Sequence, residues 1–114
     1  MLSLLARAGL VSACLLMLTL EAWALTASWY QSGSRTANGE RFHPDGMTCA
    51  HRTLRFGTRV RVTDLKTGRS VVCRVNDRGP AKWTGHAIDL SRGAAKALGI
   101  IRRGTARVSI QPVR

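Results

Sequence analysis

The stretch that decides the fold runs RVRVTDLKTGRSVVCRV from residue 59 to residue 75. Apolar and polar residues alternate on both sides of the central DLKTG turn. This is the pattern of strands that bury one face, because successive side chains of a strand point to opposite sides. We expect Asp64 to hydrogen-bond the backbone of the turn, which is a structural role. The pattern therefore predicts an antiparallel hairpin of strands over residues 59–63 and 70–75.

The segments on either side of this hairpin also favour a mainly β domain. Alternation returns over residues 106–111, and residues 26–30 are expected to form the first strand. Residues 31–46 and 77–87 hold most of the Gly, Pro, Asn, Asp and His. We expect these to be two long loops, the part of a rigid scaffold where binding and catalytic groups concentrate.

One short helix interrupts the β pattern. The Ala-rich segment predicts a helix that begins at Ser91 and ends at Leu98. Either Ser91 or Asp89 is expected to cap its first turn, because both side chains accept hydrogen bonds from free backbone N–H groups. Gly99 follows in the place where a left-handed residue ends a helix.

The chain begins with the layout of a secretory signal peptide over residues 1–24. A single early cation, Arg7, precedes an apolar run over residues 8–20, and the small residues Ala22 and Ala24 follow it. We expect cleavage after Ala24, export to the periplasm or the medium, and a single domain over residues 25–114.

Two alternatives to a cleaved signal remain open for the first residues. The segment VSAC, which ends at Cys14, resembles a lipoprotein cleavage box and leaves a lipid anchor on Cys14 as an alternative. A retained membrane helix is the weaker interpretation, because a span needs about 20 consecutive apolar residues. We therefore expect no membrane span after signal cleavage.

Composition limits the classes of protein that fit. With 114 residues, 45% of them hydrophobic, the chain is long enough for one folded domain and is not typical of a disordered tail. Its 18 Lys and Arg residues against six Asp and Glu give a formal charge of +12, which favours anionic partners. Nucleic acid is not the expected partner, because the chain is exported and its arginines are spread along it instead of forming a basic helix.

Cys49 and Cys73 remain after signal cleavage and enter an oxidising compartment, so we favour a disulfide between them. Two buried free thiols are the alternative. A zinc site with His51 and either His43 or His86 lacks the spacing of known zinc clusters. We expect no metal and no cofactor.

Only five carboxylates lie within residues 25–114, so their roles can be sorted by elimination. Asp64 and Asp89 have structural explanations in the turn and at the helix. Asp45 follows a proline and precedes a glycine, which is a turn signature. Glu40 and Asp77 lack so simple an explanation and become the leading pair for chemistry.

Seven ordered blocks over residues 27–110 resemble the rare lipoprotein A family. That resemblance implies a six-stranded double-psi β-barrel, the fold of expansins and of certain endoglucanases and lytic transglycosylases. It also implies an exported enzyme that cleaves peptidoglycan glycan strands between N-acetylmuramic acid and N-acetylglucosamine, prefers strands without stem peptides, and leaves 1,6-anhydro ends. The blocks are ASWY (27–30), TANGERF (36–42), AHRTL (50–54), FGTRVRVT (56–63), GRSVV (68–72), VNDRGP (75–80) and IDLS (88–91).

The resemblance places the catalytic groups at Asp77, Glu40 and His51. Cleavage of a glycosidic bond needs an acid to protonate the leaving oxygen and a base to accept a proton. Asp77 is expected to be this acid/base, with Glu40 as its charge-coupled partner. His51 is expected to position one of the two carboxylates by a hydrogen bond.

Five further residues are expected to bind substrate. Trp29 or Tyr30 is suited to stack on a sugar ring, with burial of one of them in the core as the alternative. Arg78 is expected to grip a carboxylate or a lactyl group through its fork of donors. Asn76, in the same block, and Asp45 complete the set. The role of an acidic group that many family members carry is either lost here or taken by Asp45.

Departures from the family pattern keep a second function open. His43 stands where an acidic residue or Asn is usual, and Ala81 where an aromatic residue is usual, with Trp83 two positions later. The alternative is an expansin-like domain that binds peptidoglycan or another polysaccharide without cutting it. In both cases we expect a monomer whose partner is the cell wall, with septal or cell-wall proteins as candidate partners.

Overall fold

The predicted hairpin is present in the computed structural model, which describes residues 24–113. Its strands are β3 (Arg59–Asp64) and β4 (Ser70–Asp77), paired antiparallel. Val60 and Val62 are fully buried while Arg59 and Arg61 are exposed, so β3 alternates as the sequence predicted. Both strands are longer than predicted.

Asp64 is fully buried at the turn between β3 and β4. Its carboxylate accepts hydrogen bonds from the backbone N–H of Lys66 and the hydroxyl of Thr67, so its predicted structural role is confirmed. It also forms an ion pair with Arg103, which lies 39 residues further along the chain. This pair joins the hairpin turn to the segment that precedes the last strand.

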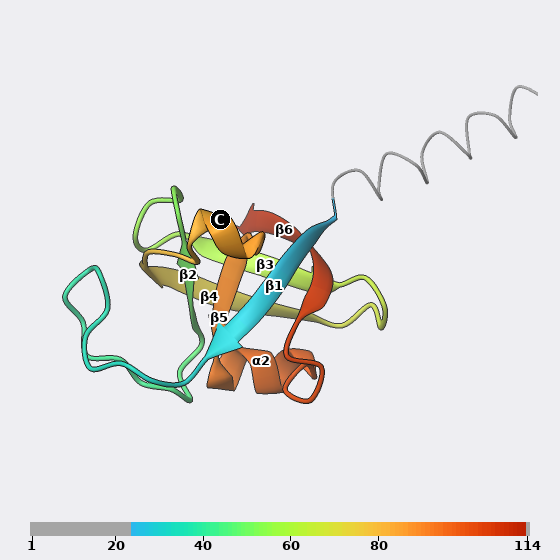
Figure 1. Ribbon diagram of the computed structural model, residues 1–114, viewed down its shortest axis with the longest axis horizontal. Coiled ribbons are helices and arrows are strands. Elements are labelled where there is room, and N and C mark those ends of the chain that lie inside the picture. Colours follow the sequence, from blue (N-terminus) through green and yellow to red (C-terminus); the bar gives the residue numbers. More distant parts are fainter. Residues whose placement is uncertain (1–23, 114) are drawn as a thin grey trace, which may run out of the picture.

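Six strands close into a barrel in the order β1-β5-β2-β4-β3-β6, with a short helix packed below them (Figure 1). Two of the contacts, β1 with β5 and β2 with β4, are parallel, and the other four are antiparallel. The expected six-stranded barrel with one helix is confirmed. The remaining elements are β1 (Leu25–Tyr30), β2 (Thr48–His51), the 3-10 turn η1 (Lys82–Thr84), β5 (Ile88–Ser91), α2 (Arg92–Leu98) and β6 (Ala106–Val113).

The helix is capped by Ser91, whose hydroxyl accepts a hydrogen bond from the backbone N–H of Ala94 at 3.3 Å. The alternative cap, Asp89, is wrong: this residue lies inside β5, two positions before the cap. Gly99 ends the helix at a φ of 83°, as predicted. Leu98 is fully buried, which closes one side of the core that β-strand side chains fill.

The inside of the barrel is built from small and branched apolar side chains, including Val75, Ile88, Leu90 and Val108, all fully buried. Within residues 24–113, no helix has the length and hydropathy needed to cross a membrane. The predicted signal peptide and the alternative lipid site at Cys14 fall outside the described residues.

Cys49 on β2 and Cys73 on β4 form the expected disulfide, with their Cα atoms 5.8 Å apart. Both residues are buried in the core. The alternatives of free thiols and of a zinc site that uses these sulfurs are therefore wrong. The bond fixes β2 beside β4, which is one of the two parallel contacts of the barrel.

The double substitution Cys49→Ala with Cys73→Ala should lower the free energy of unfolding by about 3 kcal/mol. The reason is that the disulfide closes a chain segment with a sequence separation of 24, and in the chain-entropy model this restricts the unfolded state. Urea unfolding of the oxidised protein, the reduced protein and the variant measures it. Equal stability of all three would contradict the prediction.

Candidate active site

A bulge in β4 decides where Asp77 points. Cys49 pairs with Val75, but the next residue of β2, Ala50, pairs with Asp77, so Asn76 is passed over. With regular alternation, the side chain of Asp77 would point to the same side of the sheet as that of Val75, which is fully buried inside the barrel. The extra residue turns Asp77 to the outer side instead, as bulges do near active sites.

Four residues form a row across the outer side of four neighbouring strands. Ser28 on β1 pairs with Asp89 on β5, Asp89 pairs with Ala50 on β2, and Ala50 pairs with Asp77 on β4. Residues that lie opposite one another in a sheet share a face. Two carboxylates therefore lie on either side of Ala50, with Cα atoms about 10 Å apart because strands are spaced at about 4.8 Å.

Asp77 accepts three hydrogen bonds. The backbone N–H groups of Ala37 and Arg78 both donate to Oδ1 at 2.9 Å, and the Tyr30 hydroxyl donates to Oδ2 at 3.1 Å. The Tyr30 ring is stacked on Phe42, with ring centroids 4.8 Å apart. Burial and the adjacent Asp77 raise the pKa of Tyr30 well above its ordinary value, so its hydroxyl stays a donor.

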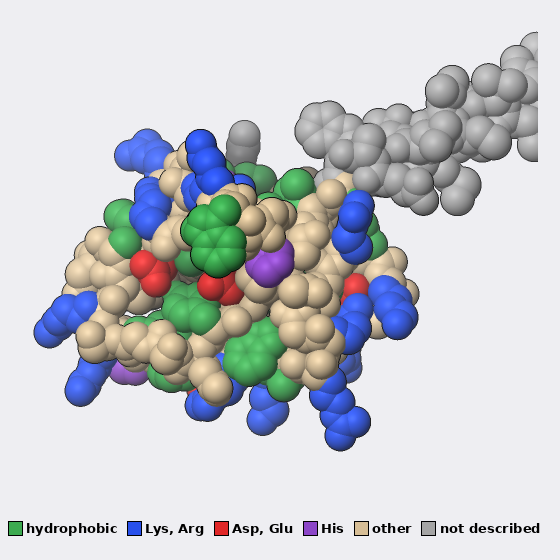
Figure 2. Space-filling model, in the orientation of Figure 1, with side chains coloured by type: hydrophobic (Ala, Val, Ile, Leu, Met, Phe, Trp, Pro, Cys, Tyr) green, Lys and Arg blue, Asp and Glu red, His purple; other side chains and the backbone are tan. Residues whose placement is uncertain are grey.

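Asp89 is the carboxylate of the row that sequence reasoning missed. It is partly buried, and one oxygen accepts a hydrogen bond from the Ser28 hydroxyl at 3.1 Å. Burial, and to a smaller extent the charge of Asp77, raise the pKa of Asp89 above its ordinary value, while Ser28 and His86 oppose the rise. In the space-filling view, many Lys and Arg side chains project from the edges of the face, and acidic side chains are visible both near its middle and beside basic side chains at the right (Figure 2).

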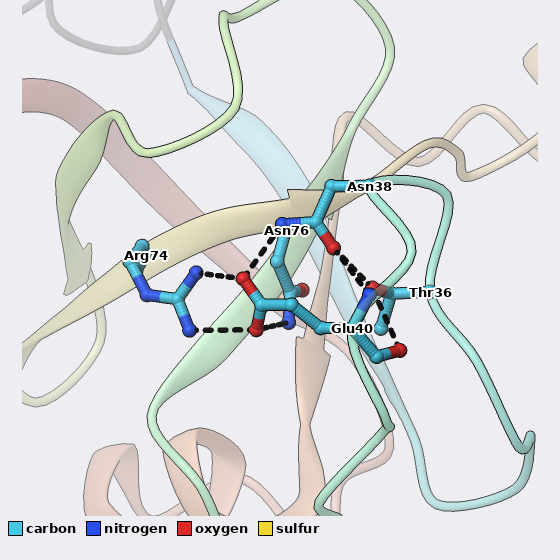
Figure 3. Close-up of polar contacts among 5 residues, drawn as sticks. All are labelled: Thr36, Asn38, Glu40, Arg74 and Asn76. Atoms are coloured by element: carbon cyan, nitrogen blue, oxygen red, sulfur yellow. Dashed lines mark hydrogen bonds and ion pairs between the residues drawn. The ribbon is translucent and has the colours of Figure 1, made fainter.

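Glu40 is held by three side chains (Figure 3). The guanidinium of Arg74 donates to both carboxylate oxygens, at 2.5 and 2.9 Å. The amide of Asn38 donates to Oε1 at 2.6 Å, and that of Asn76 to Oε2 at 3.4 Å. These donors, with Arg74 first and Asn38 second, lower the pKa of Glu40 from 4.5 to about 2. Glu40 is therefore ionised throughout the neutral range.

The Glu40 contacts join the turn over residues 36–40 to the end of β4. In the same place the backbone N–H of Asn38 donates to the carbonyl of Asn76 at 3.2 Å, and Ala37 donates to Asp77. Glu40 thus holds the segment that binds Asp77, while its own carboxylate faces Arg74. Its role as a charge-coupled partner of Asp77 stays a prediction, as does substrate binding by Asn76, which is buried.

His51 lies at the end of β2 and makes local hydrogen bonds. Its Nδ1 accepts from the backbone N–H groups of Thr53 and Leu54, both at 3.1 Å, so the neutral ring carries its proton on Nε2. Burial first, and then the charges of Arg52 and Arg78, lower the pKa of His51. Its role in positioning a carboxylate stays a prediction.

Arg78 turns away from Asp77 and stacks on an aromatic ring. Its Nη1 donates to the carbonyls of His51 and Leu54, at 3.1 and 2.8 Å, and its guanidinium lies 3.9 Å from the centre of the Phe56 ring. The contacts with Phe56 and with the two carbonyls fix the direction of the guanidinium. Binding of a substrate carboxylate by its other donors stays a prediction.

The other expected binding residues lie in different surroundings. Trp29 packs against the core, so of the two neighbouring aromatics Tyr30 is the one that contacts Asp77. Asp45 is exposed and forms a two-bond ion pair with Arg92 at the start of α2, with both distances 2.8 Å. Substrate binding by Trp29 and by Asp45 stays a prediction.

Arg52 anchors the loop that follows Asp77, and sequence reasoning did not single it out. Its Nη1 donates to the carbonyls of Pro80 and His86, at 2.8 and 2.7 Å. The loop between these two carbonyls carries Trp83, whose side chain is 88% exposed. Arg52, which directly follows β2, thus holds the two ends of this loop beside the row that contains Asp77 and Asp89.

These features define a double-psi β-barrel domain with two carboxylates on its outer face. Residues 22–110 match the family model described as "Lytic transglycolase", and the chain belongs to that family. The resemblance to the rare lipoprotein A family is confirmed, because curated relatives carry the name RlpA.

Two relatives show how close the similarity is. The chain is 57% identical over 90 residues to the "Probable endolytic peptidoglycan transglycosylase RlpA" of Synechocystis, covering 76% of this chain and 28% of that protein. It is 52% identical over 91 residues to the "Endolytic peptidoglycan transglycosylase RlpA" of Pseudomonas aeruginosa, covering 77% and 26%. The chain thus spans about a quarter of the length of these curated relatives.

Solved structures show the same barrel in other proteins. An expansin mutant of Clavibacter michiganensis in complex with cellohexaose superposes with a TM-score of 0.62 at 26% identity, covering 80% of this chain and 50% of that one. The Streptomyces papain inhibitor superposes with a TM-score of 0.66 at 22% identity, covering 80% and 93%. The second likeness concerns the fold alone.

The ion pair between Glu40 and Arg74 should weaken as the pH falls. A carboxylate whose pKa is lowered in the folded state stabilises it above the ordinary pKa, and this contribution disappears as the pH falls from 4.5 through about 2. In a double-mutant cycle of Glu40→Gln and Arg74→Met, we expect a coupling of about 1 kcal/mol or less at pH 7, since the pair is partly exposed.

Urea unfolding at pH 7, 4 and 2.5 measures this coupling. A matched cycle with Arg61→Met, an exposed cation of β3, should show none. A coupling between Glu40 and Arg74 that stays constant from pH 7 to pH 2.5 would show that the pair is not an ionic one.

Proposed function

We propose that residues 25–114 form an endolytic peptidoglycan transglycosylase domain, a carbon–oxygen lyase that acts on glycan strands. It cleaves between N-acetylmuramic acid and N-acetylglucosamine and leaves 1,6-anhydro-muramic ends. The observation that carries this proposal is Asp77, which a bulge turns to the outer face and three donors hold there. The names of the RlpA relatives support the choice of reaction and substrate.

The proposed reaction needs one proton delivered and one removed. The bond between C1 of the muramic acid and the bridging oxygen breaks, its electron pair goes to that oxygen, and an acid protonates it. The C6 hydroxyl of the same sugar then attacks C1, and a base takes its proton. Asp77 serves this proton transfer, and no water is consumed.

The residues around Asp77 support it in this proposal. Tyr30 holds one carboxylate oxygen and presents an aromatic ring to a sugar, and Arg78 uses its outward donors for the lactyl group of the substrate. Glu40 maintains the turn whose backbone N–H binds Asp77. His51, whose neutral ring carries its proton on Nε2, positions one of the two carboxylates by a hydrogen bond in this proposal.

The proposed setting is the cell wall outside the cytoplasm. The chain is exported with cleavage after Ala24, or is held by a lipid on Cys14 in the alternative. Its net charge of +12 favours contact with the anionic wall. We propose that it acts as a monomer on strands that lack stem peptides, with septal or cell-wall proteins as partners.

An expansin-like domain that binds glycans without cutting them is the second candidate. It is favoured by the similarity of the barrel to an expansin whose structure contains cellohexaose. The same row of residues would then bind sugar hydroxyl groups, and no bond would be broken.

The isosteric substitution Asp77→Asn should abolish product release, with a rate loss of at least about 100-fold, because removal of a general acid or base typically costs this much. Mass spectrometry of muropeptides and glycans, released from peptidoglycan with and without prior amidase treatment, measures it. Anhydro-muramic ends from the wild type that vanish in the variant are the expected result.

Other outcomes identify other functions. Reducing ends in place of anhydro ends would indicate a hydrolase on the same barrel. Binding of sacculi by wild type and variant alike, with no release by either, would support the expansin-like candidate. The variant must keep the wild-type NMR spectrum outside the Asp77 surroundings for the comparison to hold.

A further inference from the structure

Two arginines lie opposite each other in the segment between β1 and β2, which extends from the side of the barrel (Figure 1). Arg35 and Arg41 form an antiparallel β-bridge outside the barrel strands. The hydrogen bonds of this short ladder lie on either side of the bridge, one of them from the N–H of Phe42 to the carbonyl of Ser34 at 2.9 Å. Arg35 and Arg41 are therefore a non-hydrogen-bonded pair, the kind that brings two side chains closest together.

Both arginines point to the exposed side of this ladder. Thr36 and Phe42, which follow them in the sequence, are buried. Because neighbouring residues of an extended chain point to opposite sides, Arg35 and Arg41 share the outer face, and both are exposed. Together with Ser34 they line an open pocket of about 510 Å³. Like charges directly opposite each other repel, so this pocket favours an anion.

No carboxylate of residues 24–113 neutralises the two cations. The three acidic groups that form ion pairs do so with other arginines, as Glu40–Arg74, Asp45–Arg92 and Asp64–Arg103. The Nη1 group of Arg35 donates to the carbonyl of Gly39 at 3.1 Å, which leaves several further N–H donors of this guanidinium. Within the part of the chain that the structure describes, the side chain of Arg41 makes no hydrogen bond. The donors of both arginines are thus available to a ligand.

The pair lies on the turn that binds Asp77. The backbone N–H of Ala37 donates to Oδ1 of Asp77 at 2.9 Å. Ala37 is two residues after Arg35, so their Cα atoms lie within about 7 Å of each other. The bond from Arg35 to the Gly39 carbonyl holds the guanidinium against the same turn. Neither arginine is among the donors to Asp77, so the pair lies beside the reacting group and does not contact it.

We propose that Arg35, Arg41 and Ser34 form a subsite for a lactyl carboxylate of the glycan strand, on a muramic acid other than the one whose bond is cleaved. This inference rests on the proposed transglycosylase function. On a strand without stem peptides, the lactyl carboxylate is the ionised group of the repeating disaccharide, and the guanidinium fork matches its planar shape. A stem peptide converts this carboxylate into an amide. The arginine pair is therefore an element that selects strands lacking stem peptides.

The first measurement needs no substrate. The double substitution Arg35→Gln with Arg41→Gln removes a repulsion between exposed side chains, so the free energy of unfolding should stay the same or rise. A matched variant, Arg61→Gln with Arg107→Gln, loses the same charge from exposed positions of β3 and β6. Urea unfolding compares both with the wild type. A loss of stability confined to the Arg35 and Arg41 variant would assign the pair to the fold of the turn and overturn the subsite.

The second measurement is binding, made in an Asp77→Asn background so that the strands stay intact. Its two ligands are amidase-stripped glycan strands and the same strands with their lactyl carboxylates converted to primary amides. Substitution of Arg35 and Arg41 should weaken binding of the stripped strands at least about tenfold, because hydrogen bonds to a charged group are lost. It should change binding of the amidated strands by less than about twofold, since screening limits the effect of distant charge in 0.15 M salt.

The matched variant at Arg61 and Arg107 should change the affinity for either ligand by less than about twofold, for the same reason. Equal weakening of stripped and amidated strands by the Arg35 and Arg41 variant would overturn the assignment to a carboxylate. Unchanged binding of both ligands would overturn the subsite altogether.

Steady-state rates on stripped strands, with Asp77 restored, separate binding from chemistry. The Arg35 and Arg41 variant should raise KM at least about tenfold and keep kcat within about twofold, because the pair does not contact the cleaved bond. A fall in kcat with KM unchanged would overturn the subsite, because the arginines would then act through the turn on Asp77.

The outcomes distinguish this subsite from the function on which it rests. An active wild type whose binding does not depend on Arg35 and Arg41 would overturn the subsite and keep the transglycosylase. Binding that depends on both the arginines and the carboxylates, by a wild type that releases no product, would overturn the transglycosylase and keep the subsite.

Discussion

The bulge at Asn76 is the constraint on which the candidate site depends. Side chains of a β-strand alternate between two sides. Regular alternation in β4 would therefore direct the side chain of Asp77 into the core, to the same side as the fully buried Val75. An unpaired aspartate there would have to lose its hydration without compensation. The extra residue of the bulge reverses this alternation, so the same strand supplies Val75 to the core and Asp77 to the outer face. Two nearby residues of β4 thus have different tasks: Val75 packs in the core, and Asp77 belongs to the candidate site.

The loops around the row are held by ionic and backbone contacts, because they have few apolar side chains to bury. Glu40 joins the turn over residues 36–40 to Arg74, and Arg52 binds two carbonyls of the loop over residues 77–87. A carboxylate can orient a reaction only if its donors stay in place. Glu40, the acidic residue of the TANGE motif, thus has a structural role, because it holds the turn whose backbone N–H at Ala37 binds Asp77.

What could be predicted from the sequence follows from how local each signal is. The hairpin of β3 and β4 shows itself in the alternation of Val60, Val62 and their neighbours, and Asp64 lies in its turn. β2 and β5 have four residues each, which is too short for alternation to be distinctive. The sequence predicts only a local role for Asp89, as a helix cap, because its neighbours in the barrel, Ser28 and Ala50, lie 61 and 39 positions away. Register between distant strands is the information that a single sequence does not display.

The charge of the domain makes the arrangement of its acids meaningful. With a net charge of +12, an aspartate on the surface is expected to find an arginine, as Asp45 does. An arginine beside Asp89 would stabilise its anion and oppose the rise of its pKa that burial causes. Arg78, the nearest in sequence to Asp77, is instead directed to carbonyls and to the ring of Phe56. Among residues 24–113, Asp77 and Asp89 are therefore the two carboxylates that no arginine side chain pairs, although they lie in a strongly basic domain.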